Sequence, residues 1–147
     1  MKKIKNIAAV ATLALMSANL LAQPVMDIYK SPSCGCCVKW AALMEEQGFQ
    51  VNIHHSDDWS SLKRDAGMPM QLQSCHTAQV KGYVIEGHVP PQEVARLLTE
   101  KPDDIAGLAV PAMPRYSPGM APQGEAYRGF NVVKFSSQGK IGLYQAY

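Results

Sequence analysis

The residues best suited to chemistry in this chain are its four cysteines. Three of them crowd into the segment Cys34-Gly35-Cys36-Cys37, and the fourth is Cys75. Structural disulfides usually join distant segments, and the three clustered cysteines have only one distant partner among them. The spacing therefore indicates that the thiols form a reactive or metal-binding site.

The crowding of the thiols favours one metal over others. Thiolates are soft ligands that suit Cu(I), Zn(II) and iron–sulfur centres. A structural zinc site usually takes two separated pairs of cysteines, whereas Cys36 and Cys37 are adjacent and cannot easily converge on one tetrahedral ion. Adjacent thiolates can instead bridge different ions, and Cu(I) accepts two or three sulfur ligands. The pattern predicts a copper site, which could be polynuclear, held by Cys34, Cys36, Cys37 and Cys75.

Histidines could complete this site. His76 is adjacent to the fourth cysteine and is the favoured histidine ligand. His88 falls in a turn, where a structural role is favoured. His54 and His55 follow a predicted strand, and we interpret them as surface or packing residues.

Methionines are a second class of additional ligand, because a thioether sulfur binds copper without losing a proton. Met68 and Met70 lie shortly before the fourth cysteine. Met113 and Met120 lie in a proline-rich segment, where core packing is a weaker explanation. All four are candidates, and the predicted site includes Met70, Met113 and Met120.

Two other functions compete with copper binding. Cys34 and Cys37 form a C-x-x-C pair, which is typical of thiol–disulfide oxidoreductases. The extra thiol of Cys36 argues against that activity, because it would scramble a simple dithiol couple. The clustering argues against a domain whose cysteines are only structural staples. No catalytic residue is assigned, and enzymatic activity stays open, with a copper oxidoreductase as the form it would take.

The secondary-structure pattern predicts how these residues are positioned. A strand, the cysteine loop, a helix, a strand, a short helix, a hairpin and a further helix follow one another, which is the βαβ-ββα order of a thioredoxin-like α/β domain. A proline- and methionine-rich segment of irregular structure and a terminal hairpin complete the chain. The predicted ranges are 25–29, 36–47, 49–54, 56–66 (opened by Ser56 or Asp57), 77–80, 83–86, 90–100, 105–123 (irregular), 131–135 and 141–145.

The first 22 residues predict export. Lysines at positions 2, 3 and 5 precede the uncharged apolar run 7–15, and Ala22 ends a small-residue cleavage site, as in a secretory signal peptide. Residues 23–147 would then form a single periplasmic metal-binding domain with no membrane segment. Without the lysines of the signal, that domain has 11 basic and 12 acidic residues. No basic stripe with interleaved aromatic residues suggests nucleic-acid binding.

Five segments carry a resemblance to a known family. They are 29–37 (YKSPSCGCC), 74–78 (SCHTA), 82–90 (GYVIEGHVP), 107–111 (GLAVP) and 113–114 (MP). In this order they resemble the exported CGCC family of thioredoxin-like metal-binding proteins, long catalogued as a domain of unknown function, which includes copper-resistance proteins of the CopG type. The resemblance covers nearly all of residues 23–147, and the terminal hairpin matches only in general character.

The resemblance implies a periplasmic role in copper resistance or homeostasis. It implies copper bound by Cys34, Cys36, Cys37 and Cys75, with interconversion of Cu(I) and Cu(II). The implied partners are copper ions, and copper efflux or other periplasmic copper proteins. The roles of the methionines and histidines carry over less firmly.

Overall fold

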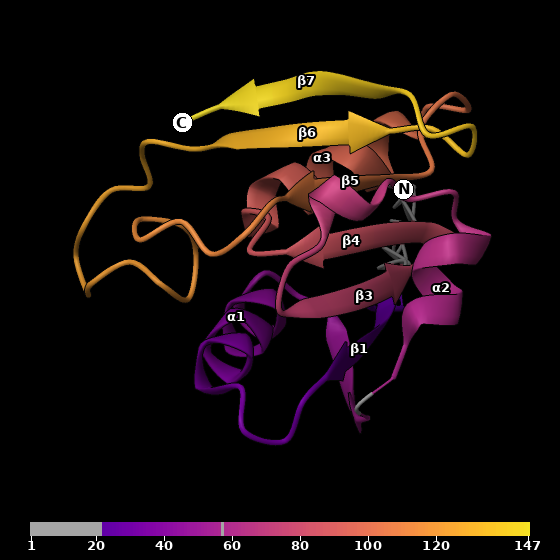
Figure 1. The fold of residues 1–147 in the computed structure, drawn as a ribbon. Coiled ribbons are helices and arrows are strands. Elements are labelled where there is room, and N and C mark those ends of the chain that lie inside the picture. The colour runs from indigo at the N-terminus through magenta and orange to yellow at the C-terminus, as the bar shows by residue number, and fades with distance from the viewer. Residues whose placement is uncertain (1–21, 57) are drawn as a thin grey trace, which may run out of the picture.

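The computed structural model describes residues 22–56 and 58–147 (Figure 1). The expected signal peptide, apart from Ala22, and Asp57 lie outside the described residues. The elements are β1 (Val25–Lys30), α1 (Gly35–Glu46), β2 (Gln50–His55), α2 (Ser60–Asp65), the 3-10 turn η1 (Met70–Leu72), β3 (His76–Val80), β4 (Tyr83–Gly87), α3 (Pro91–Glu100), β5 (Gly107–Val110), β6 (Asn131–Phe135) and β7 (Ile141–Ala146).

The strands form one mixed sheet in the order β2-β1-β3-β4-β5-β6-β7. Parallel pairing joins β1 to β2 across α1, and β4 to β5 across α3. The other neighbours pair antiparallel, and β6 and β7 extend the sheet on the side away from β1 (Figure 1). The α/β prediction is confirmed, as is a cysteine loop between the first strand and the first helix. Within residues 22–56 and 58–147, no helix is long and apolar enough to cross a membrane.

Strand β5 corrects the expectation that the segment 105–123 is irregular throughout. Its four residues are all buried, so the run shows none of the alternation that marks a half-buried strand. Gly107 is required at its start, because a Cβ there would lie 2.0 Å from the backbone oxygen of Val84. The terminal hairpin is confirmed by the pairing of β6 with β7.

Helix α2 is shorter than predicted and begins at Ser60. The chain before it is held in a turn, because the Ser56 hydroxyl accepts from the Asp58 amide at 3.2 Å and the Asp58 carboxylate accepts from the Ser60 amide at 2.9 Å. Such local side-chain bonds offer the backbone an alternative to helix. The helical pattern therefore starts only after the turn.

The core lies between α1, α3 and the sheet. Met26 and Ile28 of β1 pack with Trp40 and Met44 of α1, and all four side chains are fully buried. The Trp40 indole donates to the backbone oxygen of Val89 at 2.8 Å. This bond ties the middle of α1 to the turn after β4, so the cysteine helix has a fixed position over the sheet.

Candidate metal centre

The cysteine loop ends β1 and opens α1. The Cys34 amide donates to the Ser31 oxygen at 3.1 Å, which closes a turn containing Pro32, and Cys34 is the N-cap of α1. Cys36 and Cys37 occupy the first turn of the helix. The amides there lack helical partners and the helix dipole is positive, so this position stabilises anionic sulfur.

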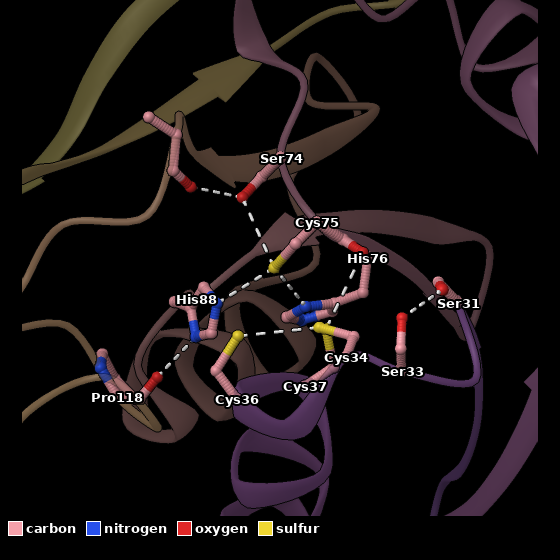
Figure 2. The surroundings of a disulfide bond; sticks show 11 residues. Ser31, Ser33, Cys34, Cys36, Cys37, Ser74, Cys75, His76, His88 and Pro118 are labelled. Atoms are coloured by element: carbon pink, nitrogen blue, oxygen red, sulfur yellow. Dashed lines mark hydrogen bonds between the residues drawn. A yellow bond between two sulfur atoms is a disulfide. The ribbon is translucent and has the colours of Figure 1, made fainter.

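All four cysteines meet at one place, shown in Figure 2. Cys34 and Cys37 form a disulfide, and Cys36 and Cys75 are free. The sulfurs of Cys34 and Cys36 are 3.6 Å apart, and all four sulfurs lie within 4.8 Å of one another. Although Cys75 lies 38 positions after Cys37, the structure brings it to the loop as the sequence predicts.

Two histidines join the cysteines. Nδ1 of His76 lies 3.4 Å from the Cys75 sulfur, and Nε2 of His88 lies 3.1 Å from it. The three ligand atoms lie within 4.8 Å of one another. Cys75 therefore belongs both to an all-sulfur group and to a mixed sulfur–nitrogen group.

The sequence favours a turn role for His88, and the structure also places its ring against Cys75. The signal that could have found it is the register of the predicted hairpin. Thr77 pairs with Glu86 in antiparallel strands, so two more steps along that register bring Cys75 opposite His88. The turn after β4 thus supplies a possible ligand.

Burial keeps both imidazoles neutral. Nδ1 of His88 lies 2.7 Å from the Pro118 oxygen, and since a carbonyl only accepts, Nδ1 carries the proton and the Nε2 lone pair faces Cys75. Burial lowers the pKa of His88. Burial and then the nearby His88 lower the pKa of His76 to about 3. A neutral imidazole whose other nitrogen donates to a carbonyl has the usual arrangement of a metal ligand.

Cys75 is protonated at neutral pH in the metal-free protein. Burial, and then the neighbouring Cys36, raise the pKa of the Cys75 thiol to about 11. A bound cation would reverse this effect, because a coordinated thiol loses its proton. Cation binding at Cys75 should therefore release a proton to solvent.

A buried ionic network holds the Cys75 segment in place. Glu86 accepts from the Lys63 ammonium at 2.8 Å, from the Ser74 amide at 2.7 Å and from the Thr77 hydroxyl at 2.5 Å. Burial raises the pKa of Glu86, and these donors oppose that rise. The sequence pattern did not indicate this network. It fixes Ser74, the residue before Cys75, to β4, the strand that leads into His88.

Two of the candidate methionines are exposed. Met70 is 80 % exposed in η1 and Met113 is 52 % exposed. Their coordination, and that of Met120, stays a prediction. Two contacts bring the proline-rich segment to the cysteines: the Ser74 hydroxyl donates to the oxygen of Ala112, and Gly119 packs so closely on α1 that a Cβ would lie 2.9 Å from the Cys36 oxygen.

Met68 is placed elsewhere. It is buried in a separate apolar cluster with Leu72, Val84, Ala109 and Phe135. Ordinary core packing therefore accounts for it.

Known proteins resemble this chain in sequence and in fold. Residues 72–120 match the model of a family described as a protein of unknown function, DUF411. Two solved structures of a copper resistance protein, copG Form 2 and copG Form 1, are 34% and 35% identical to this chain. Each superposes with a TM-score of 0.76 over 85% of this chain and 98% of that chain. No curated protein matches the chain.

Proposed function

Because this chain belongs to the family of the copper resistance protein copG, we propose that it is a copper-binding protein of copper resistance and homeostasis. The observation that carries the proposal is the convergence of four cysteine sulfurs within 4.8 Å, with Cys75 shared by two neutral imidazoles. Clustered thiolates are the principal ligands.

The donor set suits copper. Both groups contain only sulfur and imidazole nitrogen as ligand atoms, without a carboxylate. Thiolate favours Cu(I), and imidazole also serves Cu(II). Sharing of the Cys75 sulfur would let two ions sit side by side, which supports a polynuclear site.

The disulfide gives the site two donor sets. With Cys34 and Cys37 joined, the free donors are Cys36, Cys75 and the two histidines. Two electrons and two protons from a thiol reductant would convert the disulfide into two more thiols. The reduced set is richer in soft sulfur, so it would favour Cu(I) over Cu(II). This difference supports a role in interconverting the two oxidation states.

We further propose the location and class of the protein. The N-terminal pattern supports export to the periplasm with cleavage after Ala22, leaving residues 23–147 as one domain without a membrane segment. The parallel β1-α1-β2 unit, followed by the β3-β4 hairpin and α3, supports a thioredoxin-like class. Copper efflux or other periplasmic copper proteins would be its partners.

The test is copper analysis of protein purified under anaerobic conditions, comparing the wild type with Cys75→Ser. The wild type should retain copper. Cys75→Ser should lose most of it, because serine oxygen is a hard donor and Cys75 belongs to both ligand groups. Equal copper content and affinity in the two proteins would remove Cys75 from the site.

One observation favours a second candidate function. The Cys34–Cys37 disulfide lies at the start of α1, where a thiol–disulfide oxidoreductase would need it. Cys36 does not take part in that bond, yet its sulfur lies 3.6 Å from Cys34. A requirement for Cys36 therefore distinguishes copper binding, which would use its sulfur, from disulfide exchange, which would not.

A further inference from the structure

Lys30, the last residue of β1, is a buried cation without a counter-ion among the described residues. Its side chain is 0% exposed, and its ammonium makes no hydrogen bond to any residue that the structure describes. Lys63, which is also buried, has the Glu86 carboxylate at 2.8 Å. Burying an uncompensated charge is costly, so a negative group close to Lys30 would be stabilising, and residues 22–56 and 58–147 supply none.

The register of the sheet places Lys30 beside the metal centre. Lys30 pairs with His76 across β1 and β3, and directly paired residues project from the same face of a sheet. His76 in turn lies 3.4 Å from the Cys75 sulfur. Cys34 lies four positions after Lys30 in the chain. The positive charge of Lys30 also contributes to the lowered pKa of His76, which agrees with this proximity.

The proposed copper site would supply the missing negative charge. Each thiolate contributes one negative charge and each Cu(I) one positive charge, while the neutral imidazoles contribute none. The four reduced cysteines therefore form an anionic complex with Cu(I) whenever fewer than four ions are bound. In the disulfide form, Cys34 and Cys37 are joined and contribute no thiolate charge.

We propose that the Lys30 ammonium is the built-in counter-cation of the copper–thiolate complex, favouring its anionic, thiolate-rich form. This inference rests on the proposed copper function. Lys30 does not coordinate the metal. It stabilises the loaded site through its charge and destabilises the metal-free protein through its burial.

The experiment is Lys30→Met, which removes the charge and keeps an unbranched side chain. Reduced proteins are titrated with Cu(I) under anaerobic conditions against a chelating competitor, and the melting temperatures of the metal-free proteins are compared. We expect Lys30→Met to bind Cu(I) about 10- to 100-fold more weakly, because that is the effect of one nearby unit charge in partly buried surroundings. Metal-free Lys30→Met should melt at a higher temperature than the wild type.

Matched variants isolate the buried charge. Lys39→Met removes an exposed lysine of α1 and should change the Cu(I) affinity by less than about twofold, because solvent screens exposed charges. Lys30→Arg keeps the charge, so its Cu(I) affinity should be closer to that of the wild type than the affinity of Lys30→Met is. If Lys30→Met does not fold, Lys30→Gln serves the same comparison.

Unchanged Cu(I) affinity in Lys30→Met, beside a wild type that binds copper, overturns the inference and leaves the copper function intact. A wild type that binds no copper refutes the copper function itself. Asp57, which follows β2, gives a second check. If Asp57→Asn lowers the melting temperature of the metal-free wild type but not that of Lys30→Met, Asp57 is the counter-ion and the inference fails.

Discussion

Acid should destabilise the metal-free protein through His76. Its ordinary pKa is 6.5, and burial lowers it to about 3 in the folded protein. Between these values the unfolded chain takes up a proton that the folded protein does not, so the free energy of unfolding falls as the pH falls. The slope for this one group is about 1.4 kcal/mol per pH unit, which amounts to about 3 kcal/mol by pH 4.5. That is a large share of the roughly 5–15 kcal/mol typical of a domain.

The assay is urea unfolding of the disulfide-containing, metal-free protein at several pH values from 7 to 4.5. His76→Phe keeps a ring to pack on Trp40, whose ring lies 4.4 Å from that of His76, but it cannot be protonated. The carboxyl groups titrate alike in both proteins, so the difference between the two curves isolates His76. His55→Phe is the control, since His55 is exposed. If the free energy of unfolding falls equally with pH in the wild type and in His76→Phe, the reasoning is refuted.

Three further outcomes are expected. Cys36→Ser should lose bound copper and copper tolerance in cells while keeping disulfide exchange, because the disulfide does not use that sulfur; full tolerance with retained exchange would favour the oxidoreductase. His88→Ala should weaken copper binding and leave the all-sulfur group intact, and a competition titration that finds equal affinity would return His88 to a turn role. The exported protein should begin at Gln23 by intact mass, and a soluble form that retains Met1 would contradict export.

Much of the site could be predicted because local patterns determine it. The clustered cysteines follow a strand and precede an amphipathic helix, so their place at a helix start follows from short-range sequence. Cys75 precedes a recognisable hairpin, and the neighbouring strand carries the cysteine loop at the same end of the sheet. Convergence of the four sulfurs then needs only the expected topology.

The parts that the order of elements does not predict depend on how the strands pair. His88 reaches Cys75 only when the hairpin register is extended beyond the hairpin itself. Strand β5 is buried on both faces and gives no alternation. Lys30 and Glu86 belong to residue types that usually lie at the surface, so composition alone places them there. Only the full sheet shows that both side chains are buried beside the site.

The packing of Trp40 has a practical consequence for spectroscopy. Its indole is buried, bonded to Val89, and in contact with the ring of His76. Indole emission responds to nearby sulfur, to bound heavy ions and to changes in local polarity, so reduction of the disulfide or arrival of an ion beside His76 should alter it. Trp59, the other tryptophan of the chain, is only partly buried and lies in the turn before α2. Replacing Trp59 with Phe would leave Trp40 as the single tryptophan, whose emission, excited selectively over the tyrosines, should follow the occupancy of the centre.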